Sequence, residues 1–176
     1  MASRCLVVAN EPLEGERLDY VVNDCLTRAV RRFYVVVPLR RVRLKTITWT
    51  EGVWMPAERR AAMDATWKED AFRRETALDQ ESLRARHRLD RIVDRIHSAG
   101  GEAEGEVGTV SPLESTRLAI QNQAPFTEVL VATSPSGISR WVAMDLPSRV
   151  TRITDIPVST IAAAKDAPNR TRYRLL

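Results

Sequence analysis

The chain has 176 residues, of which 44% are hydrophobic and 28% charged, with a formal net charge of +4. This length suits one domain whose buried core is large enough to be stable without disulfide bonds or metal ions. No apolar run approaches the roughly 20 residues that span a membrane. The N-terminal apolar run from Cys5 to Ala9 is also too short for the core of a signal peptide. We therefore expect a cytoplasmic protein that makes no use of a membrane.

Basic and acidic residues are interleaved along the chain instead of forming blocks. Only the stretch from Arg28 to Lys45 is locally dense in basic residues, and a solvated face explains it better than a nucleic-acid footprint does. We therefore do not expect nucleic acid among the partners.

The two cysteines, Cys5 and Cys25, fall in a predicted strand and a predicted helix. Cysteines of an intracellular chain are normally reduced and buried, and neither one has further ligand-type residues at the spacing of a metal motif. His87 and His97 share a polar helix, where we expect both to be exposed. The sequence therefore predicts neither a disulfide nor a metal site.

The first third of the chain alternates buried strands with an amphipathic helix. Leu6 to Ala9 and Phe33 to Pro38 are continuous apolar runs, which is typical of strands covered on both faces. Between them, apolar residues recur at helical spacing from Leu18 to Ala29. This pattern predicts a strand, a helix and a second strand.

The stretch 39–74 is an insert with no obvious place in such a pattern. Thr46 to Thr50 alternates and is rich in β-branched residues, so it could be a short strand or an extended loop. Ala57 to Trp67 follows Pro56 and contains good helix formers. A connection of this length usually has a function of its own, and it could be a flap over the sheet edge or an oligomer contact. Trp49 and Trp54 are better explained by packing than by stacking on a base.

The remaining elements are easier to read. A helix over about 75–98 is ended by Gly100-Gly101, which supply left-handed backbone. Ser111 caps the next helix, with Pro112 in its first turn and Glu114 able to close a capping box. The remaining strands are predicted at 103–107, where the polar sequence suggests a sheet edge, at 128–132 and at 156–161. The tail 162–176 is polar and basic, and we expect it to be poorly ordered unless it docks.

Strands that alternate with helices predict a three-layer α/β/α sandwich, in which a Rossmann-like parallel sheet carries helices on both faces. We expect a single domain over 1–161, with the insert at 39–74, followed by the tail. Val158 and Ile161 should lie on an edge strand whose unpaired backbone can accept a second copy. The sequence therefore predicts a homodimer formed through this last strand.

The second half of the chain resembles the universal stress protein family, a nucleotide-binding α/β family. The resemblance rests on five segments in order: Glu102 to Gly108, Ser111 to Glu114, Val129 to Ala132, Gly137-Ile-Ser-Arg140 and Pro157-Val158. It implies a five-stranded parallel sheet in the order 3-2-1-4-5 and pairing of last strands in a homodimer. It also implies a nucleotide site, for ATP or AMP, at the loop after the fourth strand.

Candidate ligand-binding residues follow the first and fourth strands. Hydroxyl groups, backbone amides and a guanidinium at a helix N-terminus suit a small anionic ligand. The candidates are Asn10, Ser134, Ser136, Gly137, Ser139 and Arg140. Two of them also have local explanations, because Asn10 could close a turn and Ser139 could cap the following helix.

The loop after the fourth strand departs from the family pattern. In nucleotide-binding members this loop has the sequence G-x-x-G, followed by nine residues and then G-[ST]. In this chain Ala132 stands at the position of the first glycine, and Met144-Asp145 stand at the position of the final G-[ST]. A carboxylate close to a phosphate repels it. Asp145 could instead cap a helix that restarts at Pro147.

Catalytic constellations are absent from the sequence, which has no nucleophile elbow, no P-loop lysine and no histidine–carboxylate pair at metal spacing. The leading hypothesis is therefore a non-enzymatic stress-response or regulatory protein that binds a small anion or adenine nucleotide. The alternative is a protein-interaction module that has lost nucleotide binding and acts through its insert and tail. A nucleotide-acting enzyme is the third hypothesis.

Overall fold

The structure is a computed structural model that describes residues 3–10, 13, 15–41, 57–133, 139–162 and 169–173. Residues 57–62, 133, 139–145, 162 and 169–173 are described by their backbone alone. The predictions for Thr46 to Thr50, Trp49 and Trp54 lie outside the described residues. None of the described helices combines the length and the apolar character needed to cross a membrane.

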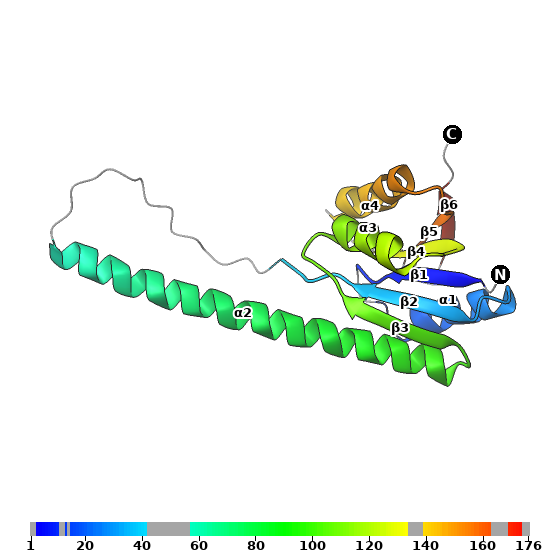
Figure 1. The fold of residues 1–176 in the computed structure, drawn as a ribbon, viewed down its shortest axis with the longest axis horizontal. Helices are drawn as coiled ribbons and strands as arrows, with labels where there is room; N and C mark the ends of the chain where they lie inside the picture. Colours follow the sequence, from blue (N-terminus) through cyan, green and yellow to red (C-terminus); the bar gives the residue numbers. More distant parts are fainter. Residues whose placement is uncertain are drawn as a thin grey trace.

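Within the described residues, six strands form one sheet in the order β3-β2-β1-β4-β5-β6 (Figure 1). The strands are β1 (Arg4–Val8), β2 (Arg32–Val37), β3 (Glu102–Val107), β4 (Glu128–Thr133), β5 (Val158–Ala162) and β6 (Asn169–Tyr173). Strands β1 to β5 are parallel, which confirms the predicted order 3-2-1-4-5. β3 is at one end of the sheet, as its polar sequence predicts.

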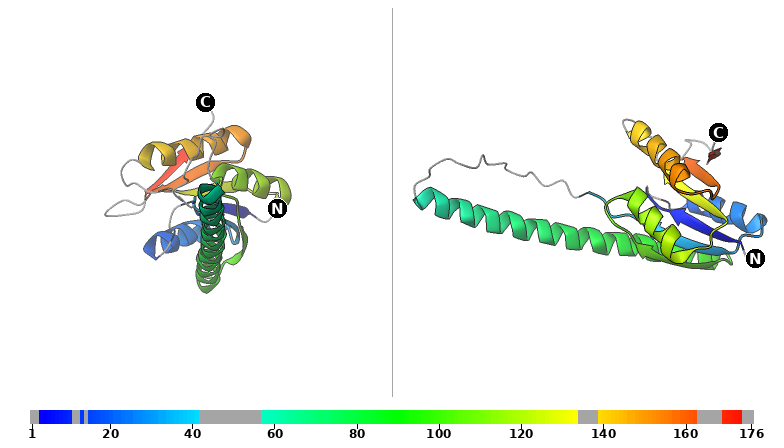
Figure 2. Two further views of the ribbon diagram at one scale, coloured as in Figure 1. Left: turned by 90° about the vertical axis from the view of Figure 1, so that its left-hand side faces the viewer. Right: turned by 45° about the horizontal axis from the view of Figure 1, so that its top comes forward.

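The helices cover both faces of the sheet, which confirms the three-layer α/β architecture (Figure 2). The helices α1 (Glu16–Thr27) and α2 (Ala57–Ser98) pack on one face, and α3 (Pro112–Gln123) and α4 (Ser139–Ile153) pack on the other. Alternate residues of each central strand enter opposite cores: Val7 packs with α1 and α2, while Leu6 and Val8 pack with α3 and α4. Burial of one aliphatic side chain stabilises the folded state by about 1.5–3 kcal/mol. The central strands, which bury side chains on both faces, therefore hold the three layers together.

The sheet continues into the tail. β6 pairs antiparallel with β5, from Val158↔Tyr173 to Ala162↔Asn169. The prediction that Val158 and Ile161 lie on an edge strand is therefore wrong, because the outer edge of β5 is already paired. A homodimer through β5 would need β6 to be displaced, and the homodimer itself stays a prediction.

Two helices differ from their predicted forms. α2 is one helix of 42 residues, about 63 Å long at 1.5 Å per residue, where the sequence predicts two shorter ones. α4 runs without a break through Asp145 and Pro147, so the predicted helix restart capped by Asp145 is wrong. Proline removes one helical hydrogen bond. Near this point, Thr151 Oγ1 donates to the carbonyl of Pro147 at 2.9 Å.

The cap of α3 is partly as predicted. The backbone N–H of Glu114 donates to Ser111 Oγ at 3.4 Å. The Glu114 carboxylate pairs with Arg117, whereas the Ser111 N–H donates to Thr109 Oγ1 at 3.2 Å. Ser111 is therefore a genuine N-cap, but the reciprocal half of the capping box is replaced by Thr109.

One carboxylate fixes the point at which α2 leaves the sheet. Glu81, which is 7% exposed, accepts from the backbone N–H of Arg40 at 3.1 Å and from Arg88 Nη2 at 2.8 Å. Burial raises the pKa of Glu81, but the hydrogen bonds from Arg88 and Arg40 outweigh it and lower that pKa below 4.5. N-terminal to this anchor, α2 extends well beyond the sheet (Figure 1).

We predict that Glu81→Gln lowers the free energy of unfolding by about 1–3 kcal/mol, because it leaves a buried donor without its charged acceptor. Since the folded-state pKa of Glu81 is below 4.5, wild-type Glu81 contributes fully above pH 4.5 and loses its contribution as pH falls through the folded-state pKa. Urea unfolding from pH 3 to 7 measures both effects. The exposed Glu69, paired with Arg73, is the matched control, and Glu69→Gln should change little. Equal losses of stability from the two substitutions would contradict the conclusion that Glu81 anchors α2 to the sheet.

Candidate functional site

The strand order creates a switch point at the carboxyl ends of β1 and β4. The two strands are neighbours, with Val8 opposite Val131. The chain leaves β1 toward α1 on one face and leaves β4 toward α4 on the other. In open α/β sheets, ligands bind outside the carboxyl ends of the strands at such a point.

The structure brings two of the predicted segments to this edge. Asn10 lies two residues after the end of β1 and is half-buried. Ser139 and Arg140 are the first two residues of α4, described by their backbone. Ser134, Ser136 and Gly137 lie outside the described residues. The pairing of β1 with β4 therefore places Asn10 and the start of α4 at the same sheet edge. Their role in ligand binding stays a prediction.

Arg17 is a residue of this edge that the sequence analysis missed. It lies in the first turn of α1, and its Nη2 donates to the carbonyl of Ile161 in β5 at 3.1 Å. β4 lies between β1 and β5, so the side chain reaches across the switch point. A cation in the first turn of a helix interacts unfavourably with the helix dipole. This unfavourable position is the feature of the sequence that could have identified Arg17 as a candidate site residue.

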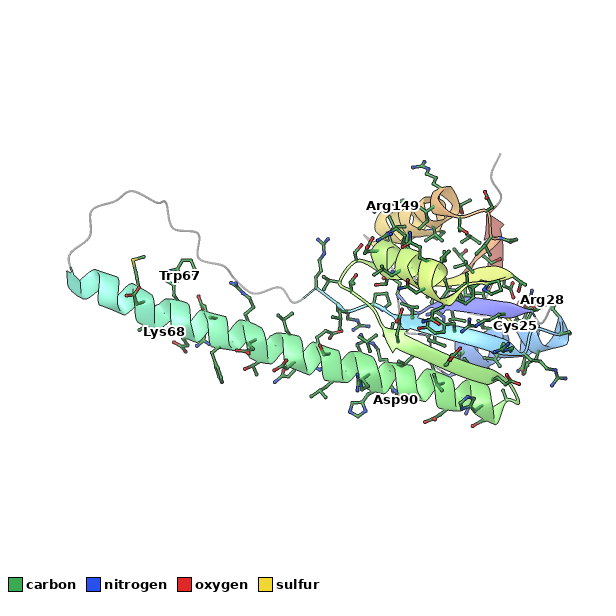
Figure 3. The ribbon with its side chains drawn as sticks, in the orientation of Figure 1. Cys25, Arg28, Trp67, Lys68, Asp90 and Arg149 are labelled. Carbon is green, nitrogen blue, oxygen red and sulfur yellow. The ribbon has the colours of Figure 1, made fainter. Side chains whose placement is uncertain are left out.

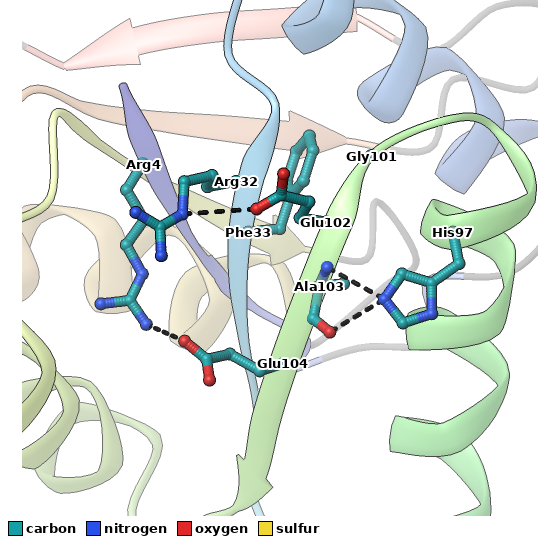
Figure 4. Close-up of a pocket in the computed structure, with 8 residues that line it drawn as sticks. All are labelled: Arg4, Arg32, Phe33, His97, Gly101, Glu102, Ala103 and Glu104. Carbon is teal, nitrogen blue, oxygen red and sulfur yellow. Dashed lines mark hydrogen bonds and ion pairs between the residues drawn. The ribbon is translucent and has the colours of Figure 1, made fainter. Parts of the chain in front are cut away.

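A separate hollow of about 280 Å³ opens at the opposite, amino edge of the sheet (Figure 4). Its lining residues are Arg4, Arg32, Phe33, His97, Gly101, Glu102, Ala103 and Glu104. The charges in this lining compensate one another, because Arg4 pairs with Glu104 and Arg32 Nε lies 3.6 Å from Glu102 Oε2. A hollow whose charges are matched internally offers little attraction to a charged ligand.

The two histidines behave differently from each other. His87 is exposed on α2, as predicted. His97 is also exposed, but its Nε2 lies 3.1 Å from the backbone nitrogen of Ala103 and 3.0 Å from the carbonyl oxygen of the same residue. His97 therefore joins the end of α2 to β3, which is a structural role.

Geometry defines the class of this protein as an α/β protein with a mostly parallel sheet and a switch point between β1 and β4. No protein-family model matches the chain, and no curated protein matches it.

We predict that Arg17→Met lowers the free energy of unfolding by about 1 kcal/mol, because the hydrogen bond from the guanidinium to the carbonyl of Ile161 is lost. Guanidinium chloride or urea unfolding measures the change. Arg152, exposed in the last turn of α4, provides a control with the same change in charge. If Arg152→Met lowers the free energy of unfolding as much as Arg17→Met does, the hydrogen bond to Ile161 does not contribute to stability.

Proposed function

We propose that this chain is a non-enzymatic regulatory protein of universal stress protein type. In this proposal, a small anionic ligand of the adenine-nucleotide class binds at the carboxyl edge of the sheet between β1 and β4. Ligand occupancy is then the signal that the protein reports.

The observation that carries the proposal is the switch point itself. Strand order 3-2-1-4-5 places the switch point between β1 and β4, and the helix that follows each strand begins at this edge. The first N–H groups of a helix have no partner within the helix and favour anions. The start of α4 at Ser139 and Arg140 therefore suits a phosphate.

Arg17 strengthens the case for an anionic ligand. Its guanidinium lies near the carboxyl ends of β4 and β5, fixed by the carbonyl of Ile161. A guanidinium presents several N–H donors, so it can hold this carbonyl and also face a phosphate. Asn10, at the end of β1, offers an amide to the opposite end of the same ligand.

Binding without turnover fits the chemistry of these side chains. Asn10 and Arg17 supply hydrogen bonds and positive charge, and neither is a nucleophile or a general base. The two histidines are carried by α2, and His97 lies at the amino edge of the sheet. The proposal therefore assigns recognition, and not catalysis, to this edge.

Titration calorimetry with ATP, AMP and cyclic AMP tests the proposal. At least one of them should bind the wild-type protein, and Arg17→Met should weaken that binding by about ten-fold or more, since a charged hydrogen bond contributes about 1.5–3 kcal/mol. Arg152→Met removes the same charge elsewhere and should bind as the wild type does. Folded protein that gives no heat with any of the three nucleotides would exclude them as ligands.

An interaction module is the second candidate function, and the projecting half of α2 favours it. This half carries Trp67 (Figure 3), which is 59% exposed, and Phe72, which is 70% exposed. Large apolar side chains exposed on a projecting helix are typical of protein contacts. A second copy of the chain is the simplest partner.

We predict that the double variant Trp67→Ser/Phe72→Ser shifts the protein from dimer to monomer without loss of thermal stability, because both side chains are already exposed. Light scattering at micromolar concentration measures the mass. Lys68→Gln, on the same part of α2, is the control and should leave the dimer intact. Wild-type protein that is monomeric under these conditions would contradict self-association through α2.

A further inference from the structure

The amino edge of the sheet holds a buried cluster of metal-ligating side chains that the sequence analysis did not predict. Cys5 of β1 lies directly opposite Glu128 of β4 in the strand register, and Cys25 covers them from α1. The two sulfur atoms and a carboxylate oxygen of Glu128 all lie within 4.8 Å of one another. Cys5 and Cys25 are 0% exposed and Glu128 is 6% exposed.

This geometry is close to that of a tetrahedral site. With metal–sulfur bonds of about 2.3 Å and metal–oxygen bonds of about 2.0–2.2 Å, neighbouring ligand atoms lie roughly 3.6–3.8 Å apart. Cys25 Sγ lies 3.7 Å from Glu128 Oε1. Three ligand atoms from three rigid elements therefore need only a small contraction to coordinate one ion.

Arg28 closes the cluster on its outer side, because it bonds to both Glu128 and Cys25. Its Nη1 and Nη2 lie 3.0 and 3.1 Å from the Glu128 oxygens, and Nη2 lies 3.3 Å from Cys25 Sγ. Asp24 holds the same guanidinium at 3.1–3.2 Å. The side chains of Arg28 and Asp24 are 30% and 34% exposed, so the cluster lies one side chain below the surface. A rotation of Arg28 therefore opens it to solvent.

The charges select the valence of the ion. Cysteine binds a metal ion as the thiolate, and the Glu128 carboxylate is paired with Arg28. When a divalent cation binds, each cysteine forms one metal–sulfur bond as a thiolate, and any proton that its sulfur carried leaves to solvent. The two positive charges of the ion then match the two thiolate charges. A monovalent ion held by the same two thiolates would leave one uncompensated negative charge in the interior, which is costly.

We propose that Cys5, Cys25 and Glu128 form a binding site for one thiophilic divalent cation of the Zn²⁺ type, with Arg28 bonded to the ligands from outside. The site goes beyond the proposed function, since it lies at the edge of the sheet opposite the β1–β4 switch point. An ion held there links β1, α1 and β4 and stabilises the folded state by mass action.

The chain has only two cysteines, so any cadmium–thiolate absorption band must come from Cys5 and Cys25. Reduced wild-type protein titrated with Cd²⁺ should develop this band and saturate at one ion per chain. Native mass spectrometry with Zn²⁺ should show one bound ion and the loss of two protons. Zn²⁺ should also raise the melting temperature, whereas Mg²⁺, which prefers oxygen ligands, should not.

Variants separate this site from adventitious binding. Cys5→Ser and Cys25→Ser should each lose the saturable Cd²⁺ band, and the double variant His87→Gln/His97→Gln should keep it. If a serine variant does not fold, the rate of thiol modification of the wild type in mild urea replaces it, and Zn²⁺ should slow that rate. Wild-type protein without a Cd²⁺ band, serine variants that bind as the wild type does, or modification that Zn²⁺ leaves unchanged would each overturn the proposal.

Discussion

Burial of the central strands on both faces is the constraint on which the rest of this structure depends. Every residue of β1 from Cys5 to Val8, of β2 from Phe33 to Val37 and of β4 from Val129 to Ala132 is buried. Strands with apolar side chains on both faces must be covered on both sides, which is typical of a parallel sheet whose crossover helices lie on its two faces. Because β1 lies between β2 and β4, the order of the strands reverses there, and this reversal creates the switch point at the carboxyl ends of β1 and β4.

The two edges of the sheet offer different chemistry. Helix beginnings, Asn10 and Arg17 gather at the carboxyl edge, where they suit an anion. The amino edge carries compensated ion pairs and the buried Cys5–Cys25–Glu128 cluster, whose soft sulfur atoms suit a cation. The projecting half of α2 is a third surface, separate from both edges (Figure 1). The three proposed roles, which are ligand recognition, cation binding and protein contact, are therefore assigned to distinct parts of the structure.

The sequence was informative where local patterns decide the structure. Continuous apolar runs identified the central strands, and the order 3-2-1-4-5 came from the family resemblance. Ser111 could be identified as a cap because its bond to the Glu114 N–H is local. The same reasoning failed for Asp145 and Pro147, because tertiary packing of Leu146 and Val150 keeps α4 continuous through a residue that disfavours helix interiors. The length of α2 was missed because its projecting half lacks a regular apolar stripe.

Long-range contacts explain what the sequence could not reveal. β6 is a short polar strand that becomes recognisable only when the edge of β5 is in place beside it. The contact between Arg17 and Ile161 spans 144 residues of chain, and the pair Cys25 and Glu128 spans 103. Neither has a spacing motif, since the sheet topology alone brings the partners together.

Crystal structures of the protein grown with ATP, AMP and cyclic AMP test the central claim most directly. The account predicts density for at least one nucleotide over the carboxyl ends of β1 and β4, with its phosphate at the start of α4 and within reach of Arg17. Density at the amino-edge hollow beside Arg4 and His97, or an empty carboxyl edge at saturating concentrations of all three nucleotides, would contradict it.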